Sequence, residues 1–195
     1  MLTIGFVRHG VTAWNKEGRA QGSTDIPLDE EGIAMAERVA ARLADEQWDV
    51  IYTSPLSRAR TTADIIGGQM PGVPLVLDDR IRETGGGKIE GTTEAERIDK
   101  WGANWRELDM GFEPHDEVIS RGLACIDEIQ DKYPGKRVLL VSHGTFIKRI
   151  LNELVPDEDF DQGVDNTSVT ILTMGDEGTR CSLYNCTAHL KAVDA

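Results

Sequence analysis

Short apolar runs rich in β-branched residues alternate along this chain with longer stretches in which apolar residues recur at helical spacing. This alternation is typical of an α/β domain with a largely parallel sheet. The sequence Gly175-Asp176-Glu177-Gly178 indicates a hairpin turn between the last two strands. The predicted strands are Leu2–Val7, Val50–Thr53, Pro74–Leu77, Arg137–Ser142, Thr167–Met174 and Arg180–Cys186.

Helical spacing predicts five helices between these strands. The helix predicted over Asp116–Tyr133 stops at Pro134-Gly135, where a helix is expected to end. Ser54 or Ser57 can cap the helix that follows the second strand. Trp101 and Trp105 stand four residues apart and are expected to be packing anchors. The predicted helices are Asp29–Glu46, Ser57–Gly67, Thr92–Leu108, Asp116–Tyr133 and Phe146–Leu154.

Length and charge exclude several classes of protein. At one domain per roughly 150 residues, the 195 residues of the chain predict a single domain over 1–195. The formal net charge is −13, so the surface repels a phosphate backbone and no nucleic-acid partner is expected, although a local basic pocket remains compatible with it. No apolar run approaches the ~20 residues that span a bilayer, so no membrane partner is expected.

The first residues of the chain and its cysteines indicate the cellular compartment of the protein. The opening MLTIGFVRHG has neither the basic region nor the cleavage site of a secretory signal. Three cysteines, an odd number without metal-type spacing, suit a reduced compartment better than a disulfide framework. We therefore expect a cytoplasmic protein, and its oligomeric state stays open.

One pattern occurs twice in the chain. The segments GFVRHG at 5–10 and LLVSHG at 139–144 are both apolar strands that end in His-Gly before a predicted helix. In a parallel α/β sheet, residues at the carboxyl ends of strands meet in one crevice, so His9 and His143 can converge on one ligand. His115 and His189 have no such setting and are expected at the surface or in packing.

Two strand-end histidines can bind a metal or carry out nucleophilic catalysis. A zinc site needs a third ligand at short spacing or an HExxH helix, and the sequence has neither, so no metal or cofactor is expected. Arg8 adjoins His9, and Arg58 follows the second strand at the same end of the sheet. Guanidinium groups bind phosphate oxygens and disfavour a nearby metal, so we interpret the site as a phosphate pocket with a histidine nucleophile.

With these motifs the sequence resembles the histidine phosphatase superfamily, also called phosphoglycerate mutase-like. The resemblance covers most of the chain, and its segments stand in the family's order. It implies a single three-layer α/β domain whose mostly parallel central sheet has helices on both faces. The segments are RHGVTAWN at 8–15, GSTDIPLDEEGIAMA at 22–36, SPLSRARTTA at 54–63, IRETGGGKIEG at 81–91 and VLLVSHGTFIKRIL at 138–151.

The resemblance also implies a role for each site residue. His9 is the nucleophile that becomes phosphorylated, and Arg8, Arg58 and His143 hold the phosphoryl group. Asn15 and the backbone amide of Gly144 complete the phosphate pocket. Glu83 is the proton donor to the leaving group, although Lys88-Ile89 stands where an aromatic residue commonly precedes Glu-Gly.

The predicted activity is the hydrolysis of small phosphorylated metabolites through a phosphohistidine, without a metal. One alternative is a 2,3-bisphosphoglycerate-dependent phosphoglycerate mutase. Mutases of this superfamily carry a longer insertion with extra basic residues, whereas residues 92–114 offer only Arg97, Lys100 and Arg106. The other alternative is a non-catalytic protein that binds phosphorylated ligands.

The rest of the substrate leaves little trace in the sequence. Arg19, Arg82 and Lys88 are candidates for a second anionic contact, and each is equally suited to be a surface charge. The substrate itself therefore stays open, and the candidates are sugar phosphates, phosphoglycerates, a ribazole phosphate or a broad range of monoesters.

Overall fold

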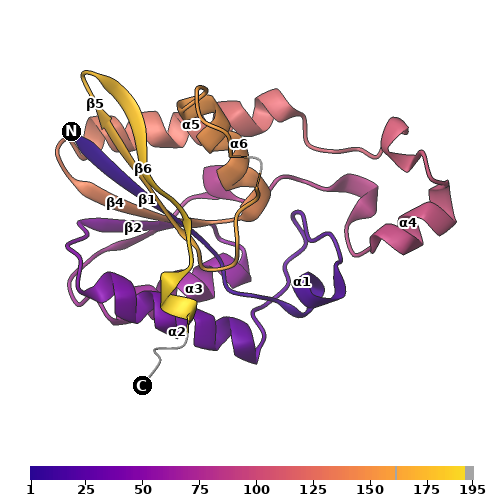
Figure 1. Cartoon of the computed structure of the whole chain (residues 1–195), viewed down its shortest axis with the longest axis horizontal. Helices are drawn as coiled ribbons and strands as arrows, with labels where there is room; N and C mark the ends of the chain where they lie inside the picture. Colours follow the sequence, from indigo (N-terminus) through magenta and orange to yellow (C-terminus); the bar gives the residue numbers. More distant parts are fainter. Residues whose placement is uncertain (161, 192–195) are drawn as a thin grey trace.

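A computed structural model describes residues 1–160 and 162–191 of the chain. Its centre is a six-stranded sheet in the order β3-β2-β4-β1-β5-β6 (Figure 1). Strands β3, β2, β4 and β1 are parallel, whereas β5 runs antiparallel to β1 and pairs with β6 in an antiparallel hairpin. The strands are β1 (Leu2–Arg8), β2 (Val50–Thr53), β3 (Leu75–Leu77), β4 (Arg137–Ser142), β5 (Val169–Gly175) and β6 (Gly178–Cys186).

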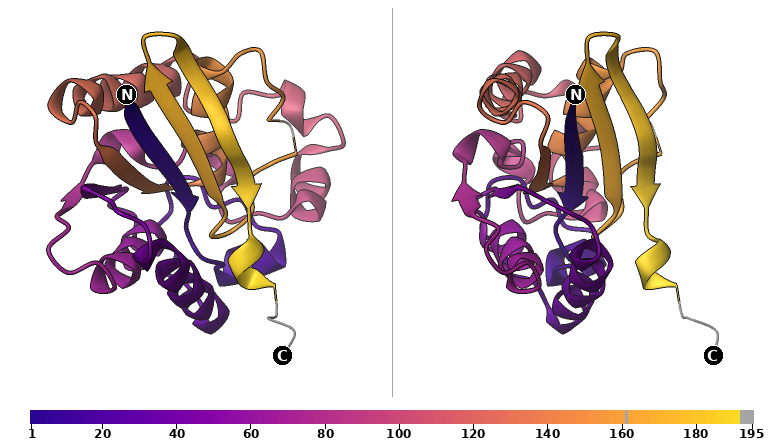
Figure 2. Two further views of the ribbon diagram at one scale, coloured as in Figure 1. Left: turned by 60° about the vertical axis from the view of Figure 1, so that its left-hand side comes forward. Right: turned by 90° about the vertical axis from the view of Figure 1, so that its left-hand side faces the viewer.

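Helices cover both faces of this sheet, which gives the three expected layers (Figure 2). Helices α2 (Glu30–Ala44) and α3 (Ser57–Gly68) pack on one face, and α5 (His115–Lys132) and α6 (Gly144–Leu154) pack on the other. The predicted α/β class with a mostly parallel sheet is confirmed. The prediction of one domain over 1–195 stays a prediction, since residues 161 and 192–195 lie outside the described part.

Side-chain alternation in the central strands builds two apolar cores. In β1, Ile4 and Phe6 are buried against α5 and α6, whereas Val7 is buried against α2 and α3. Strand β4 alternates in the same way, with Leu140 toward the first core and Leu139 toward the second. Because successive side chains of a strand point to opposite faces, a continuous apolar run is what a strand covered on both sides requires.

All predicted elements but one occur within two residues of their expected bounds, and two of the differences have clear physical reasons. Strand β5 starts at Val169 rather than Thr167, because Thr167 has a left-handed φ of 56°. The predicted helix Thr92–Leu108 is wrong as one element: α4 (Glu94–Trp101) ends at Gly102, whose φ is 85°. A separate 3₁₀ turn, Trp105–Glu107, follows it, so Trp101 and Trp105 do not share a helix face.

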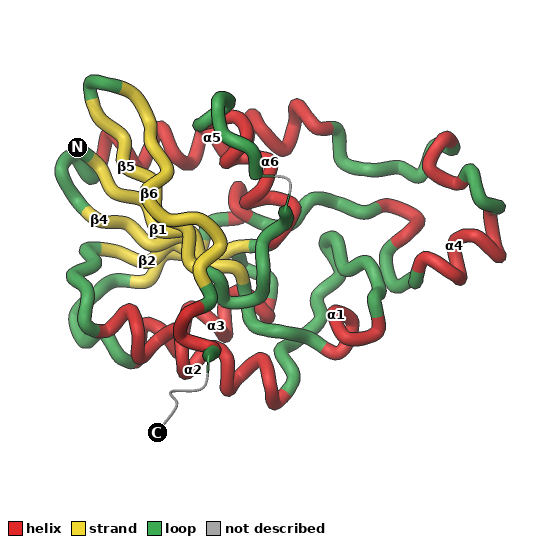
Figure 3. The backbone as a smooth tube through the Cα atoms, in the orientation of Figure 1, coloured by secondary structure: helices red, strands yellow, loops and turns green. Residues whose placement is uncertain are grey.

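Loops and short helices lie beyond the carboxyl end of β1, where the sequence predicts the site. Helix α1 (Ala13–Glu17), which the sequence did not predict, follows β1 directly, and α4 lies on the same side of the molecule (Figures 1 and 3). Two further 3₁₀ turns, Asp79–Ile81 and Gly87–Ile89, lead from β3 into this region, and Ala188–Leu190 forms another beside α2. Within the described residues, no helix is both long enough and apolar enough to cross a bilayer.

Candidate active site

The repeated His-Gly segments end adjacent parallel strands at the centre of the sheet. The register that pairs Arg8 with Ser142 leads on to His9 and His143, and the His9 amide donates to the Ser142 carbonyl at 3.0 Å. The two imidazole rings lie 5.2 Å apart, centroid to centroid. The predicted convergence of the two strand-end histidines is therefore present.

His9 is held as a neutral imidazole with a defined tautomer. Burial lowers its pKa well below the usual 6.5, and the positive charges of Arg8 and Arg58 lower it further. Its Nδ1 lies 2.7 Å from the Gly10 carbonyl oxygen, and a carbonyl only accepts hydrogen bonds. Nδ1 therefore carries the proton, and the lone pair of Nε2 is available for attack on an electrophile.

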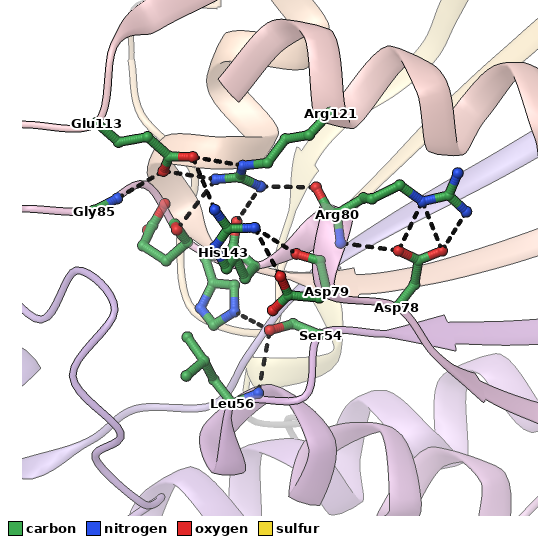
Figure 4. A network of polar contacts seen from close by, with 11 residues as sticks. Ser54, Leu56, Asp78, Asp79, Arg80, Gly85, Glu113, Arg121 and His143 are labelled. Atoms are coloured by element: carbon green, nitrogen blue, oxygen red, sulfur yellow. Dashed lines mark hydrogen bonds and ion pairs between the residues drawn. The ribbon is translucent and has the colours of Figure 1, made fainter. Parts of the chain in front are cut away.

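His143 is oriented through its other nitrogen. Its Nε2 lies 2.8 Å from Ser54 Oγ, and that oxygen accepts a hydrogen bond from the Leu56 amide (Figure 4). The Ser54 hydroxyl proton is therefore available to Nε2, and a neutral His143 then carries its own proton on Nδ1. Burial lowers the pKa of His143 well below 6.5. Its Nδ1 is buried without a hydrogen-bond partner among the described residues, as a donor intended for a ligand would be.

Two arginines supply the positive charge. Arg58 stands in the first turn of α3 and is fully buried, with Nη1 and Nη2 each 2.7 Å from the carbonyls of Thr24 and Gly22. Arg8 ends β1 and donates through Nη1 to the Val164 carbonyl at 2.6 Å. The Nε atoms of both arginines are buried without a partner, so each guanidinium keeps a donor for an anion.

Glu83 lies at the amino end of α6. Its Oε1 accepts hydrogen bonds from the amides of Thr84 and Phe146 at 2.8 and 2.9 Å, and its Oε2 accepts from the Thr145 amide at 3.2 Å. Gly144 opens the same helix, so its N–H has no acceptor within the helix. A Cβ at Gly144 would lie 3.3 Å from Arg8 Nε, which shows how closely the arginine approaches this backbone.

Asn15 belongs to α1 and is fixed through its carbonyl oxygen. Its Oδ1 accepts from the amide and hydroxyl of Thr12 at 3.1 and 3.2 Å, and from Asn166 Nδ2 at 3.3 Å. These bonds leave the Asn15 Nδ2 hydrogens as the part of the side chain that can donate to a ligand. The unpredicted helix α1 thus has a clear role, because it carries this amide to the site.

These side chains surround a cavity of about 350 Å³. Of the described residues that line it, Glu83 is the single carboxylate, and five of the seven predicted site residues are among them. Gly144 and His143 complete the group, Gly144 through its contact with Arg8 and His143 through its ring contact with His9. The lining residues are Arg8, His9, Asn15, Arg19, Ala20, Gln21, Gly22, Arg58, Glu83, Thr84, Gly85, Gly86, Ile89, Phe112, Thr145 and Arg149.

Other charged residues near the site have structural partners. Glu90 accepts hydrogen bonds from Ser23, Thr24 and Gly86, so it ties together the loop whose carbonyls hold Arg58. Glu113 is bound by Arg82, Arg121 and Gly85 (Figure 4), and Lys88 donates to the Asp109 carbonyl. None of these charged side chains is among the residues that line the cavity.

Ser54 is the residue of the site that sequence reasoning missed. It was interpreted as a possible helix cap, but the N-cap of α3 is Leu56 without a side-chain bond, and neither Ser54 nor Ser57 caps it. Ser54 instead follows β2, the neighbour of β4, and contacts His143. The argument that located the histidines, polar residues at the carboxyl ends of adjacent strands, would have found it.

The remaining histidines behave as expected. His115 is exposed at the start of α5, and His189 packs against Arg42 and Thr167. In the part of the chain that the structure describes, no group of three or more His, Cys, Asp and Glu side chains is arranged to hold a metal ion.

The comparison with known proteins decides the family. The model of the histidine phosphatase superfamily (branch 1) matches residues 4–187, which include every residue of the site. The chain belongs to this superfamily. As a histidine phosphatase superfamily member with phosphatases among its relatives, it is an enzyme of the phosphatase class, as the sequence predicted.

Relatives within the histidine phosphatase superfamily carry both phosphatase and mutase names. The chain is 33% identical over 192 residues to the uncharacterized phosphatase PhoE of Bacillus subtilis, with 97% of each chain covered. It is 32% identical to phosphoglycerate mutase-like protein 4 of Arabidopsis thaliana, covering 95% of this chain and 85% of that protein. A solved mycobacterial glucosyl-3-phosphoglycerate phosphatase in complex with VO3 is 29% identical, with a TM-score of 0.84 and coverage of 95% and 99%.

Proposed function

We propose that this phosphatase hydrolyses small phosphomonoesters through a phosphohistidine on His9, without a metal. The observation that carries the proposal is the state of His9, whose Nδ1 is bonded to the Gly10 carbonyl and whose Nε2 is unprotonated beside Arg8 and Arg58. A neutral imidazole among fixed cations suits phosphoryl transfer, in which charge is spread over the non-bridging oxygens.

The first step moves the phosphoryl group to the enzyme. His9 Nε2 attacks the phosphorus, and the bond from phosphorus to the ester oxygen breaks. Arg8, Arg58, His143 Nδ1–H, Asn15 Nδ2 and the Gly144 amide stabilise the charge on the transferred oxygens. Glu83 gives a proton to the departing alkoxide.

The second step releases the phosphate. Water attacks the phosphorus of phosphohistidine while Glu83, now a carboxylate, takes up the proton. The bond from phosphorus to Nε2 breaks, and His9 returns to its neutral form with its Nδ1–H still donating to the Gly10 carbonyl. The atoms of one water molecule therefore appear in the alcohol and the phosphate, and no cofactor is consumed.

Hydrolysis is favoured over the mutase reaction by residues 92–114. The basic side chains there have partners elsewhere: Arg97 and Arg106 bind Glu94, and Lys100 lies over the Trp101 ring at 4.6 Å. None of these three lines the cavity. A cavity of about 350 Å³ is at the small end of the range for ligand sites, which supports small metabolites as substrates. The cytoplasmic location and the absence of nucleic-acid and membrane partners remain predictions.

Trapping the intermediate tests the proposal directly. Rapid quenching of the EDTA-treated enzyme with ³²P-labelled substrate is expected to leave acid-labile, base-stable label on His9. His9→Ala is expected to lose the label and to reduce turnover by about 10⁴-fold or more, because positioning alone does not replace a nucleophile. The matched control is His115→Ala, which removes an exposed histidine.

Four results would contradict parts of the proposal. Label on serine or cysteine, or activity that requires added zinc or magnesium, would overturn the mechanism. Phosphoryl transfer to phosphoglycerate that requires 2,3-bisphosphoglycerate would identify a mutase. Tight binding of phosphomonoesters without turnover would identify a binding protein, so a panel of substrates is assayed with and without the bisphosphate.

A further inference from the structure

Arg149 is a cation of the cavity that the proposed phosphoryl transfer does not use. It stands on α6, one turn after Thr145, and both residues line the cavity that contains His9. The Nη1 of Arg149 is buried and has no hydrogen-bond partner among the described residues. Burying such a donor without an acceptor costs about 1–3 kcal/mol, so an unpaired guanidinium nitrogen in a ligand cavity calls for an acceptor from outside the chain.

The other arginines of the cavity have assigned partners. Arg8 and Arg58 donate to backbone carbonyls and lie beside His9. Arg19 lines the outer wall, but its guanidinium is bound by Glu17, Glu96 and the Gly91 carbonyl. The second anionic contact considered for Arg19, Arg82 or Lys88 is therefore better served by Arg149.

Helix geometry separates Arg149 from the phosphoryl group. The amino end of α6 adjoins His143 and Glu83, and Arg149 is five residues after Gly144, which is about 7.5 Å along the axis. Helical side chains lean toward the amino end of their helix, and Arg149 and Thr145, four residues apart on α6, both line the cavity. The remaining wall offers Ile89 and Phe112 as apolar surface, with Phe112 43% exposed.

We propose that Arg149 is a specificity-determining residue that binds a second anionic group on the alcohol part of the substrate. This inference rests on the proposed function and narrows its substrate class to phosphomonoesters with a carboxylate or a second phosphate. Both groups match the planar fork of a guanidinium, which pairs two N–H donors with two oxygens. The carbon skeleton between the two anions lies against Ile89 and Phe112.

Paired ligands that differ only by the second anion test this inference. 3-Phosphoglycerate is compared with glycerol 3-phosphate for the carboxylate, and fructose 1,6-bisphosphate with fructose 6-phosphate for the second phosphate. Each pair is measured twice: as kcat/KM on the active enzyme, and as affinity by calorimetry on a His9→Ala chain, which reports binding without turnover.

Arg149→Gln is expected to reduce the preference for the doubly anionic ligand of at least one pair by about tenfold to a hundredfold, the loss typical of one charged hydrogen-bonded pair. Arg149→Lys is expected to recover part of the preference, because lysine keeps the charge but not the fork. The matched control is Arg60→Gln, since Arg60 is an exposed arginine of α3 that does not line the cavity. It is expected to leave the preference as it is.

The inference is overturned if the unmodified site shows no preference in either pair, if Arg149→Gln leaves both preferences unchanged, or if no ligand binds at millimolar concentration. Should Arg149→Gln fail to fold by circular dichroism, Arg149→Lys decides alone, and an undiminished preference in that variant overturns the inference. Discrimination that depends on Arg149 in the calorimetry, together with no hydrolysis by the unmodified enzyme, would reject the proposed function and keep the inference.

Discussion

His9 and His143 differ in which ring nitrogen the fold occupies. In His9 the Gly10 carbonyl accepts a hydrogen bond from Nδ1–H, which leaves Nε2 with a free lone pair. In His143 the Ser54 hydroxyl is bonded to Nε2, which leaves Nδ1 as a donor. Burial lowers the pKa of both, so neither difference is lost to protonation at neutral pH. Neighbouring hydrogen bonds thus leave one histidine with the free lone pair that the proposed nucleophile needs and the other with an N–H donor, although both end a strand in His-Gly.

The proposed role of Glu83 as proton donor is tested by changing the leaving group of the substrate. A general acid matters only when the departing oxygen needs a proton, as an alkoxide does and p-nitrophenolate does not. Glu83→Gln keeps the size of the side chain and removes its acidity. Formation of phosphohistidine from an alkyl phosphate is therefore expected to slow by ~10²–10⁴, and much less from p-nitrophenyl phosphate.

The comparison requires single-turnover phosphorylation rather than kcat, because the proposed mechanism also uses Glu83 in the second step. Glu113→Gln serves as a control, since Glu113 is held by Arg121 and Gly85 and does not line the cavity. An equal loss with both substrates would remove Glu83 from the role of proton donor. Glu90 would then be the next carboxylate to test.

At the scale of elements, the site depends on how closely β1 approaches α2. Gly10 follows β1, and a Cβ there would lie 2.4 Å from the Gly32 carbonyl oxygen in the first turn of α2. The same residue donates its N–H to Thr62 and presents its carbonyl to His9. One glycine therefore sets both the packing of the helix and the tautomer of the nucleophile.

Gly10→Ala is expected to lower the free energy of unfolding by about 1–3 kcal/mol, because the added methyl meets backbone rather than a side chain that can turn away. Urea unfolding measures this loss, and kcat/KM should fall with it as the carbonyl moves. The matched variant is Gly68→Ala in α3, where a Cβ has open space, and a small gain in stability is expected there. Equal stability of the two variants would contradict the argument.

The secondary-structure elements also show which parts of the fold and of the site can be predicted from the sequence. The convergence of His9 and His143 can be predicted from the sequence. The apolar run of each strand and the alternation of strands with helices, which indicates a parallel sheet, are both visible in the local sequence pattern. Helix α1 has five residues and almost no apolar face, so periodicity does not reveal it. Ser54 directly follows a predicted strand, so the same argument extends to it. Arg149 depends on which helix face borders the cavity, and this relation between distant elements arises only in the folded chain.

The whole molecule combines a strongly acidic chain with a cationic pocket. The formal net charge is −13, yet the described residues that line the cavity include four arginines and one carboxylate. Three histidines also make the stability of the fold depend on pH. Burial lowers the pKa of His9 and His143 well below 6.5. Burial and the charge of Arg42 lower the pKa of His189 to about 4. In the unfolded chain all three return to about 6.5.

The sign of the resulting pH dependence follows from proton binding. Between the folded and unfolded pKa values the unfolded chain binds more protons, so stability is full above about pH 6.5 and falls as the pH drops below it. Carboxylates with lowered pKa, such as Asp29, Asp49, Glu90 and Glu113, lose their contribution in the same direction. They do so only below about pH 4.5, because their unfolded pKa values are lower.

Urea unfolding between pH 7.5 and 5 is therefore expected to show a fall in the free energy of unfolding of at most about 1.4 kcal/mol per pH unit for each buried histidine. His189→Gln removes one of the three histidines and is expected to reduce the slope of the free energy of unfolding against pH. It leaves His9 unchanged, because His189 contacts Arg42 and Thr167 and does not line the cavity. His115→Gln, at an exposed position, should keep the full slope. A slope that is the same in His189→Gln as in the unmodified chain would show that the acid sensitivity of the fold has another origin.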